Sequence, residues 1–279
     1  MVVQLPTEEF KLDASHLRQD AINGAVFITV ETITAMKNEL ARNSNFLEEF
    51  EEIITELRTV HPEMASISNA LTNLEMKISG KQLVQEDIAS HIEKELKVIL
   101  NRENKVIENL AKELKKYKRI MTISYSSTVF QAIDLLKPNE DVEIIYVMES
   151  RPQDEGEAMA HALAERGYNA KIIIDAAAGF FVNDVEVIVM GANSVFLDKS
   201  IINKVGSYIV ALLAKEHKIP LLVAASTNKI TTLDSEKHNE LIGYSPSKLE
   251  YDIDVPVALH ENVIFDYVPA KLITKIISD

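Results

Sequence analysis

The 279-residue sequence contains no cysteine. Without thiols the chain forms no disulfides, has no thiolate nucleophile and offers no cysteine ligand to a metal ion. It also has no apolar run long enough to span a membrane, and its first residues, MVVQLPTEEFKLD, lack the basic and apolar regions of a secretory signal. We therefore expect a cytoplasmic protein that does not associate with a membrane.

Common motifs for nucleotides and metals are also absent. The sequence has no GxGxxG turn, no Walker loop and no HExxH pair. Metal-ligand spacing is not found among the seven histidines, which are His16, His61, His91, His161, His217, His238 and His260. We therefore expect no cofactor and no metal, and we interpret each histidine as an ordinary surface or helix residue.

Acidic residues outnumber basic ones by 43 to 29, which gives a net charge of −14. Binding to a nucleic-acid backbone depends on clustered lysine and arginine that release counterions from the phosphates. The charge therefore argues against direct nucleic-acid binding, and it fits high solubility or a basic protein partner.

The hydrophobic pattern changes at about residue 117. Before this point apolar residues recur at helical spacing, as in Ile88, Ile92, Leu96 and Ile99. After it, helical patterns separate most of the short β-branched runs RIMTIS, VEIIYVME, AKIIIDA, VEVIVMG, PLLVAAS and NVIFDYV. Runs without polar alternation indicate strands covered on both faces. We predict a helical N-terminal domain over 1–117 and an α/β domain with a doubly wound parallel sheet over 118–279.

In such a sheet the ligand crevice lies beyond the carboxyl ends of the strands. Arg151 follows the second predicted strand, where its guanidinium suits a phosphate clamp, although an ion pair with Glu149 or Asp175 is the more common role. Lys204 is predicted in the first turn of a helix, where the helix dipole disfavours a cation. It then either has an anionic neighbour or points into solvent. The residues after the strands are 124–127, 149–151, 175–177, 191–193 and 225–227.

Small polar residues follow the first and fourth predicted strands. Ser124, Ser126 and Ser127 lie between a strand and a helix, where hydroxyls bind phosphate or, more commonly, cap the helix. The stretch GANSVFLDKSIINKVGSYIVALLAKEH resembles an active-site loop that leads into a helix. Such a loop usually presents an acid, and this chain has the amide Asn193 instead.

Six segments, in this order, resemble the translation initiation factor 2B alpha/beta/delta family: HPEMASISNAL, IMTISYSS, VMESRPQDEG, IIIDAAAGFF, VMGANSVFLDKSIINKVGSYIVALLAKEHKIPLLVAAS and FDYVPAKLITKIISD. The superfamily also contains methylthioribose-1-phosphate isomerase and archaeal ribose-1,5-bisphosphate isomerase. The resemblance covers nearly the whole chain. It implies a helical N-terminal domain, a Rossmann-like C-terminal domain, and a homodimer through the C-terminal domains that in some members assembles further into a hexamer.

The resemblance also implies which positions would carry isomerase chemistry. The isomerases use a cysteine after the first strand of the C-terminal domain and an aspartate in a GAD motif. In this chain Ser124 and Asn193 occupy those positions. Serine is a far weaker acid than cysteine, and asparagine exchanges no proton at useful pH, so we expect no catalytic residue at either position.

Phosphate-binding elements of the family are better preserved. Arg151 matches the arginine of the E-[ST]-R-P motif, and Asn203 and Lys204 match the NK-x-G motif. Gly24 and Ala25 match the RGA or NGA stretch, with Asn23 in place of arginine in the first form. The resemblance thus implies ligand binding by these five residues, although the NK-x-G residues also occur in initiation-factor members, where they can serve packing alone.

We predict a non-catalytic regulatory or scaffold subunit similar to initiation factor 2B, with initiation factor 2 and a sugar phosphate or nucleotide as candidate partners. Two alternatives stay open. An aldose–ketose isomerase acting on a ribose phosphate would need another acid and base, for which Glu149, Asp175 and Asp198 are the strand-end candidates. A pure assembly protein would bind no small ligand.

Overall fold

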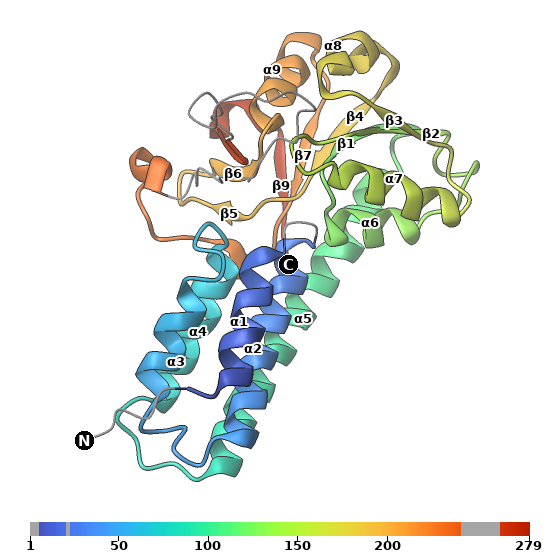
Figure 1. Cartoon of the computed structure of the whole chain (residues 1–279). Coiled ribbons are helices and arrows are strands. Elements are labelled where there is room, and N and C mark those ends of the chain that lie inside the picture. Colours follow the sequence, from blue (N-terminus) through green and yellow to red (C-terminus); the bar gives the residue numbers. More distant parts are fainter. Residues whose placement is uncertain (1–5, 21–22, 241–262) are drawn as a thin grey trace, which may run out of the picture.

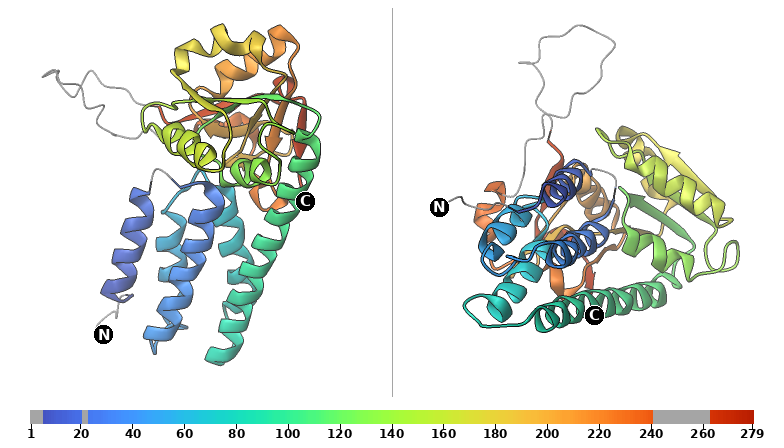
Figure 2. Two further views of the ribbon diagram at one scale, coloured as in Figure 1. Left: turned by 90° about the vertical axis from the view of Figure 1, so that its right-hand side faces the viewer. Right: turned by 60° about the horizontal axis from the view of Figure 1, so that its bottom comes forward.

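The structure is a computed structural model that describes residues 6–20, 23–240 and 263–279. Its N-terminal part is a group of helices that lie side by side below the sheet (Figures 1 and 2). We call these helices the helical region: α1 (Glu8–Gln19), α2 (Ala25–Arg42), α3 (Phe50–Arg58), α4 (Ala65–Ile78) and α5 (Gln85–Leu114). None of the helices in the described ranges is long and apolar enough to cross a membrane.

The 30-residue helix α5 joins the helical region to the sheet (Figure 2). In its first half, Ile88 and Ile92 are buried against the other helices. In its second half, Val106 and Leu110 are buried in the core that includes the sheet. One buried apolar face along the whole helix explains the periodicity of the sequence. The predicted boundary at 117 falls in the turn between α5 and the first strand.

The second part is a six-stranded parallel sheet of order β3-β2-β1-β4-β7-β9. Its central strands are buried along their whole length or nearly so, as expected for strands covered on both faces. The strands are β1 (Arg119–Ile123), β2 (Ile144–Met148), β3 (Ala170–Ile173), β4 (Val187–Met190), β7 (Leu221–Ala224) and β9 (Lys275–Ile277).

Helices cover both faces of this sheet (Figure 1). On one face, side chains of α5, α6 (Ser127–Asp134) and α7 (Glu155–Glu165) are buried against alternate residues of the central strands. On the other face, α8 (Ala178–Phe181) and α9 (Ser207–His217) are buried against the intervening residues. The predicted Rossmann-like α/β fold after a helical N-terminal region is therefore confirmed.

Two sequence predictions about the C-terminal part are wrong. NVIFDYV does not supply a strand of the parallel sheet, because β8 (Phe265–Val268) pairs antiparallel with β6 (Ile201–Lys204) in a separate sheet with β5 (Ser194–Val195). The sixth parallel strand is β9. Lys204 is not in a helix, since it ends β6 and α9 begins only at Ser207. Pairing with residues some sixty positions later holds 201–204 extended, and local periodicity does not show such a partner.

The glycine of the ESRPQDEG segment is required by close packing. A Cβ atom added to Gly156 would lie 1.8 Å from the carbonyl oxygen of Met148. Helix α7 therefore begins directly against the end of β2, and this contact positions the neighbouring Glu155.

Candidate ligand-binding site

A cavity of about 520 Å³ lies at the carboxyl ends of the strands, where they meet the helical region. Its wall includes the N-terminus of α2, the loop 61–64, the turn after β1, and parts of the segments that follow β2, β4 and β7. This place agrees with the general position of ligands in doubly wound sheets, and the volume is in the range of small-molecule sites.

Six of the seven positions that the family resemblance implies for catalysis or ligand binding line this cavity: Gly24, Ala25, Ser124, Asn193, Asn203 and Lys204. The seventh, Arg151, is not part of the wall. Its guanidinium donates to Asp154 Oδ2 at 2.6 Å, and its backbone N–H donates to Asp175 Oδ2 at 2.8 Å. The structure therefore shows Arg151 in an ion pair, although with Asp154 rather than with either partner expected from the sequence.

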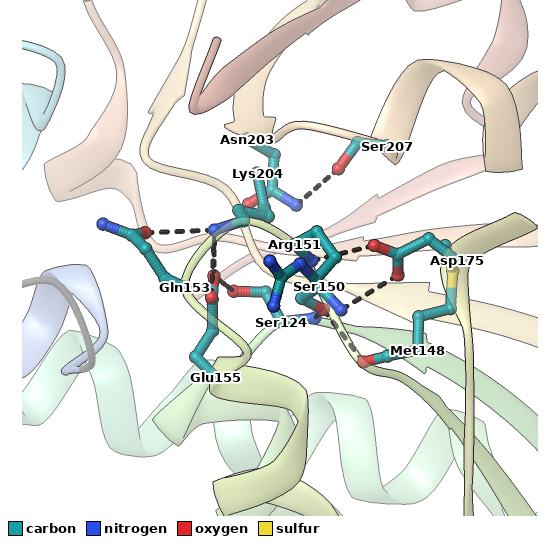
Figure 3. A network of polar contacts seen from close by, with 10 residues as sticks. All are labelled: Ser124, Met148, Ser150, Arg151, Gln153, Glu155, Asp175, Asn203, Lys204 and Ser207. Carbon is teal, nitrogen blue, oxygen red and sulfur yellow. Dashed lines mark hydrogen bonds and ion pairs between the residues drawn. The ribbon is translucent and has the colours of Figure 1, made fainter. Parts of the chain in front are cut away.

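A buried ion pair stands at the sheet side of the cavity (Figure 3). The Lys204 ammonium lies 2.8 Å from Glu155 Oε1 and donates to Glu155 Oε2 at 2.9 Å and to Gln153 Oε1 at 3.0 Å. The two charged side chains are only 3% and 5% exposed. Burial lowers the pKa of Lys204, and the charge of Glu155 opposes this without cancelling it. The anionic neighbour considered for Lys204 is thus a carboxylate of the chain itself.

Ser124 is held in an unusual backbone conformation beside this pair. Its φ is 65°, its N–H donates to Ser150 Oγ at 2.7 Å, and its hydroxyl donates to Glu155 Oε1 at 2.9 Å. Ser150 also has a positive φ of 69° and donates its hydroxyl to Met148. Left-handed conformations of this kind cost energy for residues other than glycine and are common at functional sites.

The acids proposed for an altered isomerase do not line the cavity. Asp175 instead accepts the backbone N–H groups of Ser150 and Arg151. Asp198 accepts bonds from Ser200 and Ser235. Glu149, the third strand-end acid considered for an altered isomerase, is likewise not among the residues of the wall.

Two of the family motifs have a structural explanation. Asp266 of FDYVP accepts the N–H groups of Gly206 and Tyr208 at 2.8 and 3.0 Å, which caps α9. Ser194 of GANS donates to the carbonyl of Glu63 at 2.7 Å and accepts the N–H of Ala65 at 3.0 Å. These two hydrogen bonds of the Ser194 hydroxyl hold the loop 61–64 beside Asn193.

Lys229 is a residue of the cavity wall that the sequence pattern did not indicate. This residue follows β7, lines the cavity and is only 3% exposed. Within the described part of the chain its ammonium has no hydrogen bond and no ion pair. Burial lowers the pKa of Lys229, and the more distant charge of Glu103 opposes this without cancelling it. The available signal was its place just beyond the strand-end residues 225–227.

His61, interpreted from the sequence as an ordinary surface or helix histidine, is another residue of the cavity wall. Its Nδ1 lies 2.9 Å from Glu63 Oε1, and its Nε2 lies 2.9 Å from the carbonyl oxygen of Leu17. Because both ring nitrogens face acceptors, the doubly protonated imidazolium fits best. Burial lowers the pKa of His61, but the hydrogen bond and charge of Glu63, together with the Leu17 carbonyl and Asp20, outweigh it and raise the pKa.

The third positive feature of the wall is the N-terminus of α2. No side chain caps this 18-residue helix at Gly24, and its first turn contains no acidic residue. The first N–H groups of a helix lack partners within the helix and carry a partial positive charge. The cavity therefore combines a helix N-terminus with an ammonium that has no partner among the described residues, while the imidazole of His61 is paired with Glu63 in the same wall.

Comparison with known proteins agrees with this fold. Residues 21–279 match the Initiation factor 2 subunit family, and the chain belongs to that family. A ribose 1,5-bisphosphate isomerase from Archaeoglobus fulgidus is 30% identical over 230 residues, which cover 80% of this chain and 72% of that protein. An eIF-2B subunit 2-like protein from Pyrococcus furiosus is 28% identical, covering 99% of this chain and 96% of the relative.

Among solved structures, the crystal structure of translation initiation factor eIF-2B from Pyrococcus horikoshii OT3 is similar, with a TM-score of 0.84 and 26% identity. The match covers 98% of this chain and 95% of that structure. The relatives thus include both subunits similar to initiation factor 2B and ribose phosphate isomerases, and the family alone does not decide between the two functions.

Proposed function

We propose that this protein is a non-catalytic, cytoplasmic subunit similar to initiation factor 2B, and that its cavity binds a phosphorylated small molecule. The observation that carries the proposal is Lys229, a buried ammonium that lines the cavity without a partner among the described residues. A largely buried charge without a counterion is costly, and an anionic ligand bound at Lys229 would offset that cost.

The helix N-terminus supports the same ligand class. Backbone N–H groups at the start of a helix bind phosphate oxygens well, because the groups are unpaired and the helix dipole favours negative charge. In this cavity the N-terminus of α2 begins at Gly24 and Ala25.

The absence of turnover is inferred from the groups that face the ligand. Aldose–ketose isomerisation moves a proton between neighbouring carbons and needs a group that titrates near the working pH. By the resemblance, Ser124 and Asn193 occupy the two reactive positions. The hydroxyl of Ser124 donates to Glu155, whose two oxygens are also bonded by Lys204. An isomerase with altered chemistry would have to use another titratable group of the wall, such as Glu155 or His61, and both are engaged in ion pairs, Glu155 with Lys204 and His61 with Glu63.

We further propose a homodimer through the sheet-containing part, as the family resemblance implies. Large apolar side chains are exposed on the neighbouring helices α8 and α9 at the top of Figure 1: Phe180 at 79%, Ile209 at 60%, Leu212 at 43% and Tyr208 at 40%. Burial of such side chains against a second copy would stabilise an assembly. Hexamers and binding of initiation factor 2 would build on this dimer.

Calorimetry and a turnover assay test the cavity, and light scattering tests the assembly. Titration with ribose 5-phosphate and AMP should show binding that is lost in Lys229→Met. Incubation with ribose 1,5-bisphosphate and methylthioribose 1-phosphate should give no ketose. Ketose formation at an enzyme-like rate would contradict the proposal, and failure of every phosphorylated compound to bind would leave a pure assembly protein. Ile209→Asp should convert a dimer into a monomer; a wild-type monomer would contradict the proposed assembly.

A further inference from the structure

The two lysines of the cavity are in opposite electrostatic states. Lys204 is neutralised by Glu155 at 2.8 Å, whereas the ammonium of Lys229 has no partner within the described residues. Both lysines are 3% exposed, so bulk water does little to screen either charge. The cavity therefore offers one uncompensated lysine charge rather than two.

Glu155 makes the sheet side of the cavity unsuitable for a second anion. A phosphate at Lys204 would either displace the carboxylate from a buried pair or lie beside it with charge of the same sign. Both arrangements are unfavourable, because separating a buried pair leaves an uncompensated charge and like charges repel strongly at low dielectric. Ser124 and Gln153 hold the two members of the pair in place (Figure 3).

Neutral hydrogen-bonding groups belong to the same cavity wall as the pair. The side-chain amide of Asn193 has no hydrogen bond within the described residues, and it lines the cavity. Asn203 uses its Nδ2 to bond Ser207, and Gln153 uses its Oε1 to accept from Lys204. Each of these two amides keeps its other polar atom for further bonds. Such groups match the alternating donors and acceptors of hydroxyl groups.

We infer that the ligand carries a single anionic group, bound by Lys229, and a neutral hydroxyl-bearing part that is bound by Glu155, Asn193 and Gln153. Glu155 is the specificity-determining residue that excludes a second phosphate. This inference rests on the proposed binding of a phosphorylated small molecule, and it narrows that class to monophosphates.

The test compares ribose 5-phosphate with ribose 1,5-bisphosphate by calorimetry. We expect the wild-type protein to bind the monophosphate at least about tenfold more tightly. In Glu155→Gln the charge of Lys204 is no longer neutralised. The ratio of monophosphate affinity to bisphosphate affinity should therefore fall by about tenfold or more. The double variant Glu155→Gln/Lys204→Met is the matched control, and it should lose this gain because the second cation is gone.

The outcomes separate the inference from the proposed function. If the wild-type protein binds neither compound nor other phosphorylated compounds, the proposed function fails. If it binds the bisphosphate as tightly as the monophosphate, the single-anion inference is overturned, even if Glu155→Gln does not fold. An affinity ratio that is unchanged in a folded Glu155→Gln also overturns the role of Glu155.

Discussion

Replacement of Lys229 by methionine should change stability and ligand binding in opposite directions. Methionine matches the volume of the lysine stem and carries no charge. The wild-type ammonium is 3% exposed and unpaired within the described residues, so without ligand it opposes folding. From the cost of burying unsatisfied polar groups we expect Lys229→Met to raise the free energy of unfolding by about 1–3 kcal/mol. Each kcal/mol corresponds to about 2–4 °C in the unfolding midpoint of a chain of this size.

In the presence of ligand, the wild-type protein should become more stable than Lys229→Met. At a concentration of about 100 times its dissociation constant, a ligand stabilises the folded state by about 2.7 kcal/mol. Ribose 5-phosphate should therefore raise the midpoint of the wild-type protein and leave Lys229→Met nearly unchanged. Thermal unfolding followed by circular dichroism, with and without ligand, measures both effects.

The advantage of Lys229→Met should also depend on pH. Burial lowers the pKa of Lys229 from its ordinary 10.5, so the folded state loses this proton more readily than the unfolded state. The wild-type protein should therefore become more stable relative to the variant as the pH rises toward 10.5. The matched control is Lys105→Met, at an exposed position within α5, which should change little. A less stable Lys229→Met that keeps the ligand response would refute the reasoning.

Three further predictions follow from single contacts. The pKa of His61 is raised above 6.5, so the stability that its cationic form provides is present at lower pH and is lost as the pH rises through the raised value. Urea unfolding at a series of pH values should show this loss in the wild-type protein and not in His61→Gln. Gly156→Ala should lower the free energy of unfolding by more than about 3 kcal/mol, because the added Cβ would overlap the carbonyl oxygen of Met148. In Gly179→Ala the nearest atom lies 3.8 Å from the added Cβ, so the free energy of unfolding should fall by less than about 1 kcal/mol in the same thermal assay. Arg151→Ala should change ribose 5-phosphate affinity by less than about threefold in calorimetry, because Arg151 lies outside the wall; a loss as large as that of Lys229→Met would contradict the assignment.

The fold was largely predictable from local pattern. The buried strands β1, β2, β4 and β7 are short β-branched runs, and helices lie between most of them, so periodicity alone indicated the doubly wound sheet. Strands β6 and β9 were not recognised, since Ile201–Lys204 lead directly into the apolar pattern of α9 and β9 has only three residues. Their pairing with β8 and β7 is a tertiary event.

The site was predictable only where it coincides with strand ends or family motifs. Ser124, Asn193 and Lys204 are at such positions, and all three line the cavity. Lys229 and His61 were missed because their importance comes from burial and from contacts with distant segments. The Lys204–Glu155 pair could not be predicted from local sequence either. The two residues are 49 positions apart and come together only when α7 packs at the end of β2.

Phosphorus NMR of ribose 5-phosphate in the presence of the protein tests the central claim most directly, since one time course reports both binding and conversion. We predict that the ribose 5-phosphate resonance broadens or shifts in proportion to protein concentration and that no new resonance grows. Steady growth of a ribulose 5-phosphate resonance at an enzyme-like rate would contradict a cavity that holds its ligand without converting it.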